Sequence, residues 1–126
     1  MPTKSAALRV MLSAVNDSGM EPDKAFDESL VLAMFNDFTP GRRIQLAAGA
    51  VDQVVAFTAA LALLVFSHDN PFKLRVNDVE TLLPNLRCFL IWADDKDEAA
   101  ASAAVFLSGN GTTPSDVEVW VIEKPA

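Results

Sequence analysis

The stretch PGRRIQLAAGAVDQVVAFTAALALLVFS, from Pro40 to Ser67, is the longest apolar tract in the chain. Thr39 suits a helix cap before it, and Pro40 suits a first helical position. Pro71 follows shortly after the tract and would end a helix there. Wound as a helix, the second half of the tract is apolar on nearly every side and must be covered all round. We therefore predict one long buried helix over about residues 40–67.

A helix that spans a membrane is the main alternative for this tract, which is long enough for that role. Asp52 and Gln53 lie in the middle of such a span, where a carboxylate costs about 2.5–3.5 kcal/mol. The tract also lacks an aromatic belt. We therefore favour a buried helix and expect no membrane contact.

Small and polar residues recur along the predicted helix at steps of three and four, and would share one face. They include Gly49, Asp52, Gln53 and Ala56. The favoured explanation is close packing against another helix of the same chain. The alternative is self-association of two copies through this face, with the polar residues fixing the register.

The remaining segments are predicted to cover the long helix. Residues 4–16 and 22–37 carry apolar residues three or four apart, which predicts two helices before it. Residues 72–76, FKLRV, alternate apolar and charged side chains, as a strand with one solvated face does. The chain therefore changes from helical to strand periodicity after Pro71.

The C-terminal part predicts two more strands with a helix between them. Residues 86–93, LRCFLIWA, form a nearly continuous apolar run, typical of a strand covered on both faces. Residues 117–123, VEVWVIE, predict the second strand, and the alanine-rich residues 95–108 predict the helix. Strand, helix and strand in this order indicate a parallel βαβ crossover unit.

Together these patterns predict an α+β, or α/β, fold in a single domain over residues 1–126. A helical half, residues 1–70, surrounds the long helix. A mixed half, residues 71–126, supplies a small sheet that contains the βαβ unit. The length suffices for one core without disulfides or metals, and neither a metal nor a cofactor is predicted.

Composition disfavours several classes of protein. The net charge of −7 at pH 7 argues against nucleic-acid binding, because an acidic chain repels phosphates. The one cysteine, Cys88, lies in an apolar run and is predicted to be a buried, unreactive thiol. A single cysteine forms no internal disulfide, and the N-terminal residues do not resemble a secretory signal, so we expect a cytoplasmic protein.

One cluster of acids and one histidine are the candidates for chemistry. The acidic cluster, Asp94, Asp95, Asp97 and Glu98, follows a predicted strand, where carboxylates can hold Mg²⁺ or Ca²⁺. Its spacing matches no calcium loop, and a capping box in a solvated turn is the favoured explanation. His68, the only histidine, lies at the end of the predicted long helix, where a capping role is favoured over catalysis.

We therefore predict that the chain is not an enzyme but a small acidic adaptor, inhibitor or assembly component that binds another protein, either a basic protein or a second copy of itself. The predicted partner-binding residues are Asp94, Asp95, Asp97, Glu98 and Trp120, an aromatic side chain suited to anchor a partner. The predicted self-association residues are Gly49, Asp52, Gln53 and Ala56. One alternative is a small α/β enzyme or a ligand- or metal-binding domain that uses the acidic cluster. The other is an acidic mimic of nucleic acid.

Overall fold

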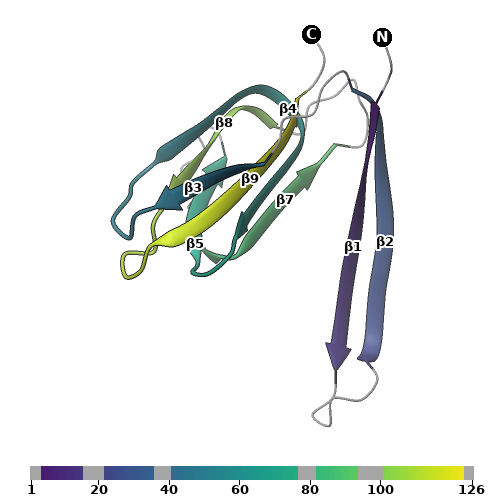
Figure 1. Ribbon diagram of the computed structural model, residues 1–126, viewed down its shortest axis with the longest axis horizontal. Coiled ribbons are helices and arrows are strands. Elements are labelled where there is room, and N and C mark those ends of the chain that lie inside the picture. Colours follow the sequence, from purple (N-terminus) through teal and green to yellow (C-terminus); the bar gives the residue numbers. More distant parts are fainter. Residues whose placement is uncertain (1–3, 16–21, 36–40, 77–81, 94–100, 124–126) are drawn as a thin grey trace.

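The computed structural model describes residues 4–15, 22–35, 41–76, 82–93 and 101–123, and these residues form two antiparallel sheets (Figure 1). One sheet has two strands and the other has seven. The strands are β1 (Lys4–Val15), β2 (Pro22–Phe35), β3 (Arg42–Leu46), β4 (Gln53–Ser67), β5 (Phe72–Val76), β6 (Leu83–Leu86), β7 (Cys88–Trp92), β8 (Ala101–Ser108) and β9 (Ser115–Glu123).

The prediction of an α+β, or α/β, fold is therefore wrong, since the described residues contain strands and no helix. The predicted long helix over residues 40–67 is instead β3, a turn and β4, and the two helices predicted before it are β1 and β2. No βαβ unit exists among these residues, because β8 replaces the predicted helix and the strands pair antiparallel. None of the described residues belongs to a helix with the length and hydropathy needed to cross a membrane.

The physical reason is that pairing with distant strands outweighs local helix preference. Alanine and leucine favour a helix over other residues by less than about 1 kcal/mol each. A continuous apolar run fits a buried helix and a buried strand equally well when only its periodicity is considered. Strands from both predicted halves, residues 1–70 and 71–126, pair in the seven-stranded sheet, so the division into a helical and a mixed half is not seen.

Strand β4 organises the seven-stranded sheet because it hydrogen-bonds to three other strands. Its first part, Gln53–Ala60, pairs with β8, and its second part lies between β7 and β9. Register shifts occur between Ala56 and Ala59 and between Ala60 and Ala62. β4 therefore passes from the layer β4-β8-β5-β6 into the layer β3-β9-β4-β7, and Figure 1 shows it curving between the two.

The core lies between these two layers. Buried side chains alternate with outward ones along residues 63–67 of β4 and 115–120 of β9, as expected of strands with one face inward. The buried side chains of the main core are Leu46, Val55, Leu63, Val65, Phe72, Leu74, Val105, Leu107, Val117 and Val119. Both layers contribute to this list, so the fold is a two-layered β-sandwich.

Three predicted strands are confirmed in position. Residues 72–76 form β5, the run 86–93 contains β7, and the run 117–123 lies within β9. The prediction that the second of these is covered on both faces is wrong, because Cys88 and Leu90 are exposed. Cys88 is accordingly an exposed thiol rather than a buried one, although partial burial does raise its pKa.

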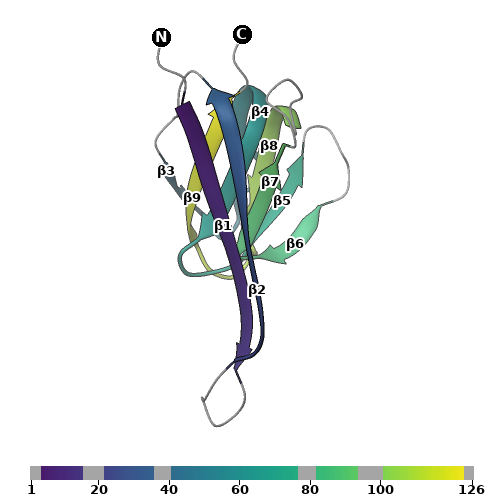
Figure 2. The same cartoon turned by 90° about the vertical axis from the view of Figure 1, so that its right-hand side faces the viewer.

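Strands β1 and β2 form a long antiparallel hairpin outside the sandwich, which we call the arm. The arm meets the sandwich near one end, where Ala6 packs against a small cluster that includes Ala62 and Ile122. From there it diverges from the sandwich and extends past its far end (Figures 1 and 2). The arm and the sheet beside it therefore contact each other at one end only and are separated at the other.

Candidate functional site

The side chains of β4 that point away from the core begin the candidate site. Leu64 and Phe66 are partly exposed and alternate with buried Leu63 and Val65. Residues directly opposite each other on neighbouring strands lie on the same face of a sheet. The pairing of β4 with β7 and β9 therefore defines one surface, the outer face, made of Ala62, Leu64, Phe66, Cys88, Leu90, Trp92, Trp120 and Ile122, with Glu118 at its edge opposite Phe66.

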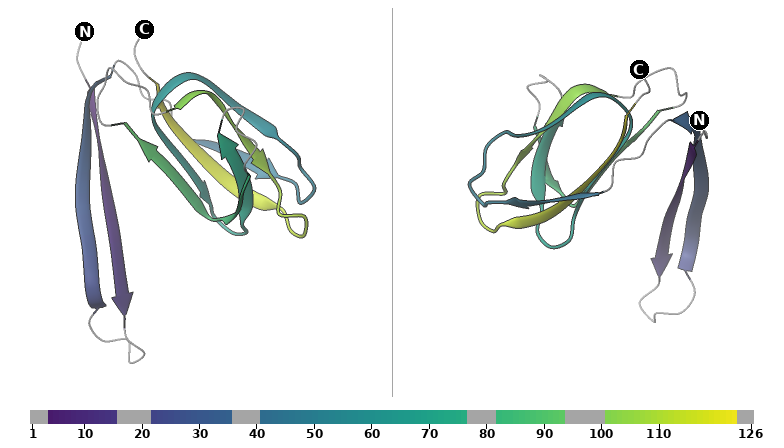
Figure 3. Two further views of the ribbon diagram at one scale, coloured as in Figure 1. Left: turned by 180° about the vertical axis from the view of Figure 1, so that it is seen from behind. Right: turned by 45° about the horizontal axis from the view of Figure 1, so that its top comes forward.

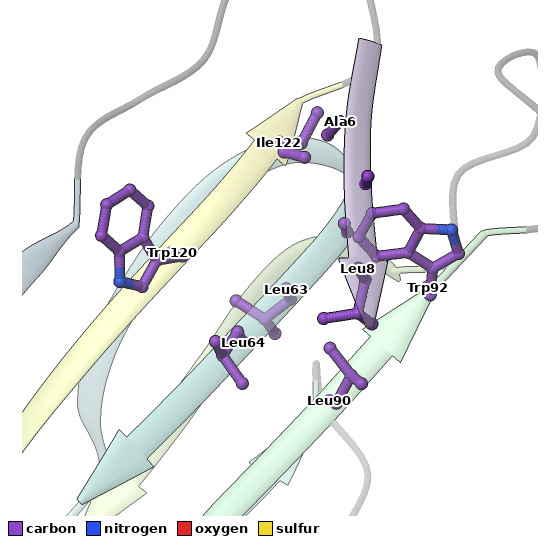
Figure 4. A pocket seen from close by; sticks show the side chains of 10 residues that line it. Ala6, Leu8, Leu63, Leu64, Leu90, Trp92, Trp120 and Ile122 are labelled. Atoms are coloured by element: carbon purple, nitrogen blue, oxygen red, sulfur yellow. The ribbon is translucent and has the colours of Figure 1, made fainter. Parts of the chain in front are cut away.

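The outer face is apolar and forms a groove with the base of the arm. The groove has a volume of about 160 Å³ and is lined by Ala6, Ala7, Leu8, Ala62, Leu63, Leu64, Leu90, Trp92, Trp120 and Ile122. Figure 4 shows Leu8 of the arm beside Trp92 and Leu90 of β7. None of these described lining residues is charged. The groove is therefore suited to apolar groups rather than to ions.

Much of this surface is open to solvent. Leu90, in the groove, and Phe66, which does not line it, are each 38% exposed. On the arm, Leu12 is 72% and Leu30 43% exposed. Leu8 and Leu12 lie on the same face of β1, and Leu30 lies opposite Leu8, so the covered and exposed residues belong to one arm surface. We call this surface the inner face of the arm: Ala6, Leu8, Val10, Leu12 and Leu30, together with Glu28, which lies opposite Val10.

Charged residues border the outer face beside Trp120. The Trp120 indole N–H donates a hydrogen bond to Glu118, and His68 Nε2 lies 2.8 Å from a carboxylate oxygen of Glu118. These two hydrogen bonds, in that order, lower the pKa of Glu118. Two guanidinium nitrogens of Arg43 donate hydrogen bonds to the two carboxylate oxygens of Asp116, and this interaction lowers the pKa of Asp116. A charged rim thus holds the indole in place.

Gly41 provides the other constraint on the same indole. A Cβ atom at Gly41 would overlap the indole of Trp120 at Cε2, Cζ2 and Nε1. The ring therefore lies directly on the backbone before β3, and only glycine leaves room for it. With its N–H bonded and one part of its ring against the chain, Trp120 loses little further freedom on contact with a partner.

Asp69, next to this rim, is expected to make the stability of the fold fall in acid. Backbone N–H groups of Asp116 and Asn70 donate to Asp69 and lower its pKa below the ordinary value of 3.8. The unfolded chain then binds more protons than the folded chain around pH 4. Stability is therefore present above that pH and is lost as the pH falls through the folded pKa.

We expect Asp69→Asn to lower stability at pH 7 and to flatten the fall in acid. Urea unfolding at pH 7 and at pH 3 measures both effects, with Glu28→Gln on the exposed arm as the control. If the free energy of unfolding fell between pH 7 and pH 3 by the same amount in Asp69→Asn as in the unaltered chain, Asp69 would not be the source of this acid sensitivity.

The residues predicted from the sequence are only partly brought together. Trp120 lies in the groove, and its role as an anchor stays a prediction. The acidic cluster, Asp94, Asp95, Asp97 and Glu98, lies outside the described residues. Within the described ranges, no three histidine, cysteine or acidic residues are grouped to hold a metal ion.

The predicted self-association face is not formed, because its three- and four-residue spacing shares a face only in a helix. Gly49 lies in the turn between β3 and β4, and no atom lies within 4 Å of the position that a Cβ would take there, so this glycine permits no close approach. Asp52 has a φ of 49° and pairs with Arg75, at 3.1 Å. Gln53 and Ala56 are three residues apart in β4. Self-association through these four residues stays a prediction without its helical basis.

Most residues of the outer face were not predicted as functional. Leu64, Phe66, Leu90 and Trp92 lie in runs where the inward and outward side chains are both apolar, so alternation could not separate them. Trp120 could be named because charged neighbours mark the outward side of β9. Comparisons with protein-family models, with curated proteins and with solved structures found no match for this chain.

Proposed function

We propose that this chain is a non-enzymatic component of a protein assembly and that its outer face is where a partner docks. The observation that carries the proposal is the continuity of apolar side chains over the outer face and the inner face of the arm. Large exposed apolar surfaces are costly in water, at about 25 cal/mol per Å², and commonly mark protein contacts.

The distribution of residue types supports a protein partner. Trp92 and Trp120 lie among leucines, and Glu118 and Arg43 lie at the border. An apolar centre with tryptophans inside a polar rim is the usual composition of a protein interface. A location in a reducing compartment such as the cytoplasm forms part of this proposal, because the chain has one cysteine.

A small-molecule or metal site is the second candidate, and it is less well supported. The groove, about 160 Å³, is smaller than the ~300–1,000 Å³ typical of ligand pockets and is lined without charged groups. The acidic cluster that motivated this alternative lies outside the described residues. Mimicry of nucleic acid fits the net charge of −7 but not an apolar docking face.

The test is capture of partners from native lysate with two matched variants. Leu90→Asp puts a charge on the outer face, whereas Val54→Asp puts the same charge on the first part of β4, where Val54 is 54% exposed. We expect Leu90→Asp to weaken capture at least about tenfold, since leaving a carboxylate in an apolar interface costs more than ~1.4 kcal/mol.

Val54→Asp is expected to capture the same proteins as the unaltered chain. Circular dichroism of both variants checks that they keep the fold. Equal capture by the unaltered chain and by Leu90→Asp would contradict docking at the outer face.

A further inference from the structure

We infer that the partner at the outer face is a second copy of this chain, whose arm lies across it. This inference rests on the proposed function and names the occupant of the same surface. It follows from two uncovered apolar surfaces that occur together in every copy: the far part of the inner face of the arm and the open end of the outer face.

The arm is longer than the surface that its own chain offers it. β1 has 12 residues, and at about 3.3 Å per residue it is about 40 Å long. β7, which borders the outer face, has five residues and is about 16 Å long by the same measure. The far part of the arm, with Leu12 72% exposed, therefore extends past the outer face of its own chain (Figure 2).

An isolated two-stranded hairpin is only marginally stable in water. The arm nevertheless carries exposed apolar side chains along its length, including Met11 at 63% and Leu30 at 43% exposure. Its pairing is supported within the chain by one ion pair among the described residues, between Arg9 and Asp27 at 2.7 Å, and both of these side chains are exposed. Exposed ion pairs contribute little to stability, so the arm gains most from being covered.

The open end of the outer face is the matching surface. The arm diverges from its own sandwich toward this end, as two views show (Figures 1 and 3), and Phe66, which does not line the groove, stays exposed there. At the closed end, Ala6 of the arm and Trp92 of the outer face already pack against one cluster, around Ala62 and Ile122. The two surfaces therefore already fit each other within one chain, and the open end continues the same interface.

The size of the contact agrees with a reversible dimer. The outer face is three strands wide and about 16 Å long, which is roughly 200–250 Å² for strands about 4.8 Å apart. Two arms that each covered a whole outer face of the other copy would bury on the order of 1,000 Å² with both sides counted, the lower limit for a specific interface. The new contact is smaller than this, because the base of each arm already covers part of its own outer face. We therefore expect association in the micromolar range rather than a permanent dimer.

Sedimentation over about 1–500 μM tests the inference with one arm variant and one face variant. Leu12→Asp charges the inner face of the arm, and Leu90→Asp charges the outer face. We expect the unaltered chain to dimerise and each variant alone to weaken dimerisation at least tenfold. In a mixture of the two variants, one of the two exchanged contacts joins an intact arm to an intact outer face, and the other carries both substitutions. We therefore expect association to be partly restored but weaker than that of the unaltered chain.

A control variant, Val51→Asp, changes a residue that is 79% exposed in the segment between β3 and β4 and should dimerise like the unaltered chain. Dimerisation of Leu12→Asp at full strength would show that outer faces meet each other without the arm, and would overturn the inference. A monomer at every concentration would overturn it too. The proposed function would survive that second result if a different protein were captured and lost in Leu90→Asp.

A disulfide test gives a separate measurement, because Cys88 lies exposed on the outer face opposite Phe66. Mild oxidation of Leu12→Cys is expected to join position 12 of one copy to Cys88 of another and to give a covalent dimer. Two controls have one thiol each. Leu12→Cys combined with Cys88→Ser measures disulfides between two copies of position 12, and the unaltered chain measures disulfides between two copies of Cys88. A product joined only within one chain would overturn the inference.

Discussion

Replacing Phe72 with alanine is expected to lower the free energy of unfolding by about 3–5 kcal/mol, the usual loss for a buried phenylalanine. Phe72 begins β5, is 0% exposed and is the largest fully buried side chain of the described residues. It lies in the core cluster to which both layers contribute. Domains of this size are stable by only about 5–15 kcal/mol, so much of the total would be lost. Urea unfolding followed by tryptophan fluorescence measures the change.

Phe66→Ala is the matched control, because it removes the same side chain from the outer face. Phe66 is 38% exposed, and its ring contacts His68 edge-on with centroids 5.0 Å apart. We expect a loss of about 0.5–1.5 kcal/mol from this contact, together with weaker partner binding. Similar losses of stability in the two variants would contradict the assignment of Phe72 to the core and Phe66 to the outer face.

Replacing Gly109 with alanine is expected to destabilise the sandwich by about 1–3 kcal/mol, as overpacking usually does. A Cβ atom there would overlap the carbonyl oxygens of Ala47 and Ala48. These oxygens belong to the turn before β4, and the Gly109 N–H donates a hydrogen bond to the Ala50 carbonyl, 2.9 Å away. Because the overlapping atoms are backbone, no side-chain rotation relieves the contact. Urea unfolding measures the loss.

Gly49→Ala provides the control in the same turn. No atom lies within 4 Å of the position its Cβ would take. Alanine there reduces the freedom of the unfolded chain, so we expect a change of no more than about 0.5 kcal/mol in either direction. Equal losses in Gly49→Ala and Gly109→Ala would show that the turn does not pack on Gly109.

The candidate site shows how far periodicity can be used. In β5, Phe72 and Leu74 alternate with charged residues. Only a strand places the apolar and the charged side chains on opposite faces, and the predicted strand is confirmed. In β1, the spacing of Leu8, Met11 and Leu12 fits a helix, while that of Leu8 and Leu12 also fits a strand face. Residues 4–15 form the strand β1 rather than a helix because β2 pairs with them along their whole length.

The amino-acid pattern alone predicted the strands whose alternation or β-branched residues admit one structure, and the count of one cysteine excluded an internal disulfide. The tertiary structure decided the rest: that residues 53–67 are a strand, which of its apolar side chains face outward, and where the arm leaves the sandwich. A strand gains its hydrogen bonds from partners distant in sequence. A run that is apolar on both sides does not identify those partners, because its pattern is the same whichever strands pair with it.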